Sequence, residues 1–91
     1  RRFYEACDGV TQSLLTRCEW HMTTQSRALT LIIHCPDAGF VWRVLNNLIP
    51  LGTQLERFSE RARIRITPPI GTGSPFEMRV DELSIYHESD G

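Results

Sequence analysis

Four short segments of this chain alternate apolar and polar residues, and two longer segments place apolar residues three or four positions apart. Alternation with a period of two is typical of β-strands that bury one face, and the longer spacing is typical of amphipathic helices. The resulting order is helix–strand–strand, repeated once. Because each helix and each strand pair has one apolar face to bury, this order predicts a two-layer α+β sandwich, with a four-stranded sheet and both helices on one of its faces.

The first half of the chain is predicted to form a helix over residues 3–19 and then a hairpin. The apolar side of the helix consists of Phe3, Cys7, Val10, Leu14 and Cys18. We place the hairpin turn at Gln25-Ser26, which pairs Thr24 with Arg27. This register puts Met22 opposite Leu29 and Trp20 opposite Leu31, all on one face of the sheet.

The second half begins with Pro36, which ends the second strand, and Asp37, which we expect to cap the next helix. Pro50 falls inside the helical pattern and removes a backbone hydrogen-bond donor. We therefore predict two arms of one bent element, residues 38–49 and 51–59. Their apolar side consists of Val41, Val44, Leu45, Leu48, Leu51, Leu55 and Phe58.

The segment RARIRITPPIGTGSPFEMRV predicts a second hairpin, because its apolar residues alternate with arginines and a glutamate. If Ile66 faces Phe76, the outward pairs are Arg65 with Glu77, Arg63 with Arg79, and Arg61 with Asp81. The apolar parity changes after Val80, which predicts a β-bulge near Asp81-Glu82. The connection PPIGTGSP is followed by a strand rather than a helix N-terminus, so it is not expected to bind phosphate.

Two α-helix–strand–strand units in this order correspond to a circularly permuted ferredoxin-like sandwich with an antiparallel sheet. The second and fourth strands, residues 27–35 and 76–86, are the longest and most apolar, so we expect them in the centre. The two shorter strands would then form the edges. The chain of 91 residues is predicted to be one domain, residues 1–91, and a piece of a longer protein.

The net charge of −1 gives no global field that would gather nucleic acid. The open sheet face is predicted to carry Tyr86 as its one aromatic residue, too few to stack bases, so no nucleic-acid partner is expected. No nucleophile–base pair or metal-ligand cluster is evident, so we predict neither an enzyme, a cofactor nor a metal site. The residues expected to face a partner are Arg61, Arg63, Arg65, Arg79, Ile32 and His34.

The three cysteines contain no C-x-x-C pair and do not suggest a zinc site. The predicted path of the chain brings the end of the second strand back to the end of the first helix. Cys18 and Cys35 are therefore expected to be neighbours on apolar faces. In an oxidising compartment they could form a disulfide and leave Cys7 free; the alternative is three small buried hydrophobic residues.

The arrangement resembles the periplasmic domains of inner-membrane assembly proteins of type IV pili and type II secretion systems, the PilO and GspM type. The resemblance lies in the strand ALTLIIHCPD, the helix FVWRVLNNLIPLGTQLERF, the basic strand RARIRI and the closing strand FEMRVDELSIYH. It covers residues 27–87, and the first helix by its order alone.

The resemblance implies a non-catalytic scaffold domain in the periplasm. It would be the C-terminal part of a longer membrane-anchored protein, held by an inner-membrane helix and a coiled coil that precede Arg1. Such a domain pairs with itself or with a sister protein of the same fold. The alternatives are a ferredoxin-like regulatory domain that senses a small molecule, and a cytoplasmic location. A scaffold would dimerise without ligand, whereas a sensor would be stabilised by one metabolite.

Overall fold

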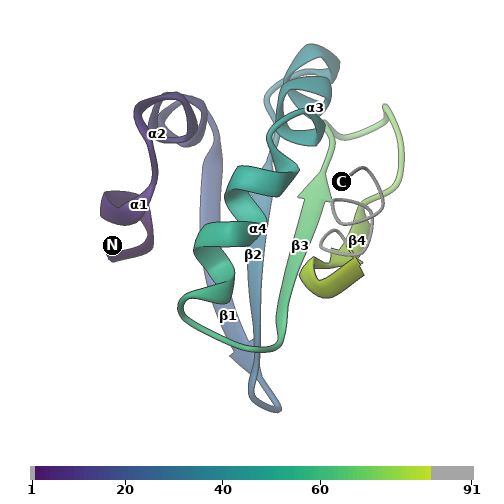
Figure 1. Cartoon of the computed structure of the whole chain (residues 1–91). Helices are drawn as coiled ribbons and strands as arrows, with labels where there is room; N and C mark the ends of the chain where they lie inside the picture. The colour runs from purple at the N-terminus through teal and green to yellow at the C-terminus, as the bar shows by residue number, and fades with distance from the viewer. Residues whose placement is uncertain (1, 83–91) are drawn as a thin grey trace.

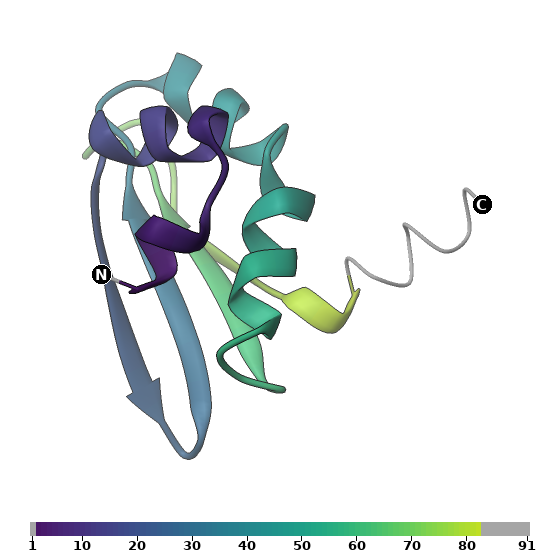
Figure 2. The ribbon, with the colours of Figure 1, turned by 60° about the vertical axis from the view of Figure 1, so that its left-hand side comes forward.

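The structure is a computed structural model, and it describes residues 2–82. It consists of a four-stranded sheet with helices on one side (Figures 1 and 2). The elements in chain order are α1 (Arg2–Ala6), α2 (Gly9–Thr16), β1 (Glu19–Gln25), β2 (Ala28–His34), α3 (Ala38–Leu45), α4 (Leu48–Glu56), β3 (Ala62–Thr67) and β4 (Phe76–Arg79). The predicted helix–strand–strand repeat is therefore present, but each predicted helix consists of two short helices.

The sheet is mixed, with the spatial order β1-β2-β3-β4. The two hairpins are antiparallel, whereas β2 and β3 are parallel. The predicted fully antiparallel sheet is therefore wrong. The predicted central position of the second strand and edge position of the first are confirmed, whereas the third strand is central and the fourth is an edge, contrary to prediction. The central strands are β2 and β3. They are parallel because α3 and α4 carry the chain back along the sheet before β3 begins. Parallel neighbours need such a crossover connection.

The core lies between the sheet and the helices. Leu31, Ile33, Ile64 and Ile66 of the central strands are fully buried. They belong to one apolar cluster with Leu15 of α2, Val44 of α3, and Leu51 and Leu55 of α4. Arg61, Arg63 and Arg65, which alternate with the buried residues of β3, are exposed on the opposite face. The predicted assignment of the two faces of the sheet is confirmed for β1, β2 and β3.

The first predicted helix is interrupted at residues 7 and 8. Asp8 accepts a hydrogen bond from the Thr11 N–H (2.8 Å) and is the N-cap of α2. An N-cap residue has an extended backbone, so a continuous helix cannot pass through it. Because α2 begins as a separate helix at Gly9, a different set of its residues faces the core. Val10 is 73% exposed, contrary to prediction, and Thr11 and Leu15 are buried in its place.

The second predicted helix is also split, but not at its proline. Asp37 caps α3 as predicted and accepts a hydrogen bond from the Phe40 N–H (2.9 Å). The break falls at Asn46 and Asn47, between α3 and α4. Pro50 is the third residue of α4, where a backbone N–H would have no partner within the helix. The proline is therefore accommodated in the first turn of the helix and does not bend it.

The first hairpin is displaced by two residues from its predicted register. Met22 pairs with Leu31 and Trp20 with Ile33. The turn lies at Ser26-Arg27, and both residues have positive φ values, 52° and 68°. Positive φ at both central residues matches the right-handed twist of a two-residue hairpin. A shift of two keeps every side chain on its predicted face.

The second hairpin has the predicted register, with Ile66 opposite Phe76 and Arg63 opposite Arg79. The last strand is shorter than predicted, because β4 ends at Arg79 and residues 80–82 are helical. The predicted bulge at Asp81-Glu82 is therefore absent from this segment. The remainder of the predicted strand, including Tyr86, lies outside the described residues.

Candidate interaction surfaces

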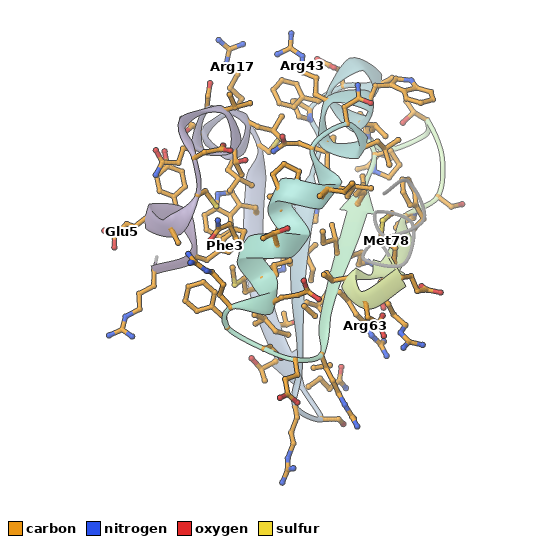
Figure 3. The ribbon with its side chains drawn as sticks, viewed as in Figure 1. Phe3, Glu5, Arg17, Arg43, Arg63 and Met78 are labelled. Atoms are coloured by element: carbon orange, nitrogen blue, oxygen red, sulfur yellow. The ribbon has the colours of Figure 1, made fainter. Side chains whose placement is uncertain are left out.

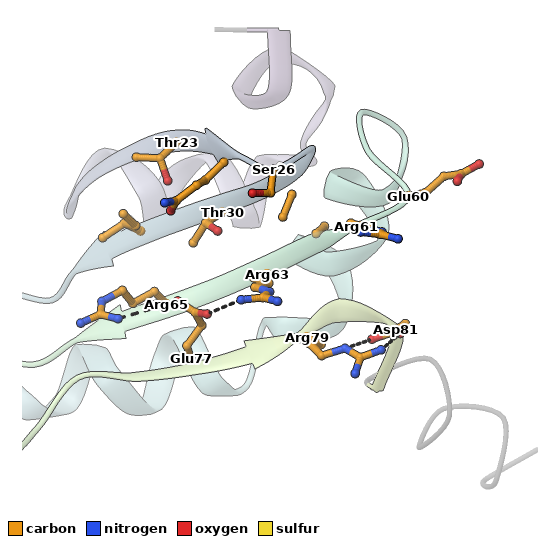
Figure 4. Close-up of a pocket in the computed structure, with 14 residues that line it drawn as sticks. Thr23, Ser26, Thr30, Glu60, Arg61, Arg63, Arg65, Glu77, Arg79 and Asp81 are labelled. Carbon is orange, nitrogen blue, oxygen red and sulfur yellow. Dashed lines mark hydrogen bonds and ion pairs between the residues drawn. The ribbon is translucent and has the colours of Figure 1, made fainter.

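The open face of the sheet carries a shallow depression of about 780 Å³ (Figure 4). It lies on the side of the sheet opposite the helices and draws on all four strands and the Ser26 turn. The lining residues are Thr23, Gln25, Ser26, Ala28, Thr30, Ile32, Glu60, Arg61, Ala62, Arg63, Arg65, Glu77, Arg79 and Asp81. We refer to this surface as the arginine face.

The arginine face is partly neutralised by its own carboxylates. Glu77 of β4 lies between two arginines of β3, with 3.2 Å from its Oε2 to Arg63 Nη1 and 3.7 Å from its Oε1 to Arg65 Nη1 (Figure 4). Cross-strand register explains the contact, because Arg65 is directly opposite Glu77. These side chains are a third to a half exposed, so each ion pair is screened by solvent.

Arg79 and Asp81 form a second ion pair at the end of β4. Arg79 donates from Nε to Asp81 Oδ1 (3.1 Å) and from Nη2 to Asp81 Oδ2, so the ion pair is bidentate. These hydrogen bonds lower the pKa of Asp81. The predicted pair of Asp81 with Arg61 is wrong, because the helical residues 80–82 turn Asp81 toward Arg79. Four arginines and three carboxylates line the depression, and this near balance does not favour a polyanion.

The structure brings five of the six predicted partner-facing residues together, namely Arg61, Arg63, Arg65, Arg79 and Ile32. His34 lies outside the depression and stacks on His21, with ring centroids 5.4 Å apart. Within residues 2–82, no group of three histidine, cysteine, aspartate or glutamate side chains is placed to hold a metal ion.

A second groove, of about 660 Å³, runs between α2 and α3 and was not predicted. It is lined by Gly9, Val10, Ser13, Leu14, Arg17, Arg43, Asn46 and Asn47. Arg17 and Arg43 extend from the same end of the molecule (Figure 3). The groove lies where α2 begins at Gly9, after its Asp8 cap, and where α3 ends at Leu45. The pair Asp8-Gly9, a good cap followed by a poor helix former, was the signal in the sequence.

The third surface is the outer edge of β1. The Leu29 N–H donates to Arg61 O of the segment before β3, and the Cys35 N–H donates to Thr67 O. The odd-numbered residues of β2 therefore direct their N–H and C=O groups toward β3, away from β1. The β1 residues opposite them form no backbone hydrogen bonds to β2. It follows that Trp20, Met22 and Thr24 direct their N–H and C=O groups outward. Within residues 2–82, none of these groups has a backbone partner.

The predicted cysteine neighbours lie at one corner of the sheet. Cys35 is buried, and Cys18 is partly buried. Burial raises the pKa of the Cys18 thiol to about 11, with smaller contributions from Cys35 and Asp37. Burial, and then Asp37, also raise the pKa of Cys35. Both sulfur atoms are free thiols in the structure.

Comparison with known proteins identified no matching family model, no matching curated protein and no matching solved structure. Among the helices of residues 2–82, none is long and apolar enough to cross a membrane.

Proposed function

We propose that this domain is a non-catalytic interaction module that pairs with a second copy of itself through the outer edge of β1. The observation that carries the proposal is a seven-residue edge strand whose outward backbone groups are unpaired within the described chain. An exposed edge of this length is a template for another strand. Such edges are usually blunted by proline or lysine, and β1 contains neither.

The residues of β1 suit antiparallel pairing with an identical strand. If Met22 lies on the two-fold axis, Trp20 faces Thr24 of the second copy, and all seven residues of each strand are paired. On the open face, Glu19 then meets Gln25 and His21 meets Thr23. No like charges oppose one another, and the outward groups form the hydrogen-bonded pairs of the new ladder.

A two-fold axis perpendicular to the sheet would join two four-stranded sheets into one of eight strands. This interface is isologous, because the same edge is used by both copies. It also brings the two α1–α2 pairs to the same side of the joined sheet, since both helices lie on the same sheet face (Figure 2). Backbone hydrogen bonds supply the affinity in this mode of recognition, and the side chains supply the register.

The resemblance to type IV pilus and type II secretion assembly proteins gives the proposal a setting. In that setting the domain is periplasmic and is held by an inner-membrane anchor outside the residues printed here. The support is the repeated helix–strand–strand order, whereas the mixed sheet differs from the antiparallel ferredoxin-like sheet that the order of elements predicted. An anchor would raise the local concentration of the domain, so a modest edge contact would be sufficient for assembly.

The substitution Thr24→Pro tests the proposal. Proline removes the outward N–H of Thr24 but no hydrogen bond to β2, and proline is tolerated on edge strands when its nitrogen faces outward. The loss of one hydrogen bond from each copy is expected to weaken dimerisation about tenfold or more. The matched control is Thr24→Val, which keeps the N–H and should dimerise like the parent chain.

Sedimentation equilibrium over a range of protein concentrations measures the effect, and circular dichroism verifies that both variants are folded. A parent chain that remains monomeric would contradict self-pairing. Equal dimerisation of the folded Thr24→Pro variant and the control would contradict the assignment to β1.

The arginine face favours a second candidate function, a regulatory domain that binds a small anionic molecule. Arg61 lines the depression and, within residues 2–82, takes part in no ion pair. A guanidinium group of this kind is suited to carboxylate or phosphate. A sensor would gain melting temperature with one small anion and lose this gain in Arg61→Gln, whereas an interaction module would not respond.

A further inference from the structure

The register of the first hairpin, continued by one position beyond the two strands, brings Cys18 opposite Cys35. Every pair between β1 and β2 follows one register, from Gln25 opposite Ala28 to Glu19 opposite His34. The ladder ends at this pair, and one further step in the same register brings Cys18 opposite Cys35. Both side chains lie on the helix-covered side of the sheet, as do Trp20 and Ile33 in the adjacent pair.

Hydrogen bonding identifies this position as a non-hydrogen-bonded pair. The Cys35 N–H donates to Thr67 O (2.9 Å), on the side of β2 away from β1. The Cys18 N–H donates to Leu15 O (3.1 Å) at the end of α2. Residues at such positions have Cα atoms about 4.5 Å apart, the closest approach in an antiparallel ladder. This separation lies within the range that a disulfide spans, about 4.4 to 6.8 Å.

We propose that Cys18 and Cys35 form a disulfide. It would link the connection between α2 and β1 to the connection between β2 and α3. The reaction joins the two sulfur atoms and removes the hydrogen from each thiol. An external disulfide such as glutathione disulfide accepts the two electrons and two protons, and it leaves as two glutathione thiols. Exchange begins at Cys18, because it is the more exposed of the two residues.

Cys7 has a different position, which makes it the natural control. It is buried, and its thiol donates a hydrogen bond to the Phe3 carbonyl at 3.1 Å in the α1 region. The proposal therefore specifies one pairing out of three. It is also independent of self-pairing, since both sulfur atoms belong to the same chain.

The test is equilibration of the folded protein with excess glutathione disulfide at about pH 9, which offsets the scarcity of thiolate at a pKa near 11. Digestion after arginine without reduction then separates the three thiols. Cys7 falls in residues 3–17, Cys18 in residues 18–27 and Cys35 in residues 28–43.

Mass spectrometry should find the second and third peptides joined, with two hydrogen atoms lost, and Cys7 free. The melting temperature should rise by roughly 10 °C and return to its starting value after reduction. Cys18→Ser and Cys35→Ser should abolish the rise, whereas Cys7→Ser should retain it. The proposal is overturned if the two peptides remain separate, if Cys7 is joined to either, or if the link connects two chains.

Discussion

At the scale of single residues, two aspartates decide where the helices begin. Asp8 and Asp37 each accept a hydrogen bond from a backbone N–H three residues later, at 2.8 and 2.9 Å. Such caps satisfy one of the donors that the first turn of a helix leaves unpaired. Thr11 takes part in both the cap and the core. Its backbone N–H donates to Asp8, and its buried hydroxyl accepts a hydrogen bond from Asn47 Nδ2 (2.9 Å) at the junction of α3 and α4.

The cap at Asp8 predicts a pH-dependent contribution to stability. The hydrogen bonds from Thr11 lower the pKa of Asp8 below its ordinary value of 3.8. A carboxylate with a lowered pKa in the folded state stabilises fully above the unfolded pKa and loses this effect as the pH falls through the folded pKa. Asp8→Ala should therefore unfold at a lower urea concentration than the parent chain at pH 7, and the gap should narrow below about pH 4.

Urea titrations of the parent chain and the variant at several pH values measure this gap. Asp8→Asn is the control, because asparagine also caps helices but does not titrate. A gap between the parent chain and Asp8→Ala that is unchanged between pH 7 and pH 2 would show that the carboxylate does not act as described.

At the scale of elements, the first hairpin stores strain in its turn. Ser26 and Arg27 both have positive φ, a conformation that costs L-residues other than glycine, asparagine and aspartate about 1 kcal/mol or more. The double substitution Ser26→Asn/Arg27→Gly supplies the preferred residues for this turn. It should raise the free energy of unfolding by about 1 kcal/mol.

Urea unfolding measures the change in free energy. The matched control is Gln25→Asn/Ser26→Gly, which suits the turn one residue earlier. It should bring a smaller gain, because it relieves the positive φ of Ser26 but not that of Arg27. If the control stabilises the chain and the Ser26→Asn/Arg27→Gly variant does not, the turn and the register of β1 with β2 are wrong.

The elements show which features the sequence could predict and which it could not. Alternation in RARIRI was sufficient to predict the two faces of β3. The predicted register, with Ile66 opposite Phe76, was one of several that keep these faces, because a shift of two residues changes only the pairs. The first register was wrong because neither Ser26 nor Arg27 signals positive φ. The parallel pairing of β2 with β3 could not be predicted from local patterns, since it depends on how the α3–α4 connection packs on the sheet.

The candidate surfaces also differ in how far the sequence alone could predict them. The arginine face was predictable, because alternation alone places Arg61, Arg63 and Arg65 on the open side of β3. The groove between α2 and α3 was not, because the continuous helix predicted over residues 3–19 concealed the cap at Asp8. The edge position of β1 was predicted, but the outward direction of its backbone groups required the hydrogen bonds of Leu29 and Cys35.

At the scale of the whole molecule, the two halves of the chain form one sheet through the parallel contact of β2 with β3. This arrangement leaves β1 and β4 as the edges, and they differ in length. β4 has four residues and is followed by a helical turn, whereas β1 has seven and ends in a tight turn. The longer edge is therefore the better template for another strand, and it lies beside the corner that holds Cys18 and Cys35.

The most direct test of self-pairing is amide hydrogen exchange of Trp20, Met22 and Thr24, measured by NMR at low and high protein concentration. We expect exchange of these three amides to slow as the concentration rises, because pairing with a second β1 gives each outward N–H an acceptor. In Thr24→Pro, the dependence on concentration at Trp20 and Met22 should be greatly reduced. Exchange rates that stay the same at all concentrations, in a chain that is monomeric or that dimerises elsewhere, would contradict pairing through β1.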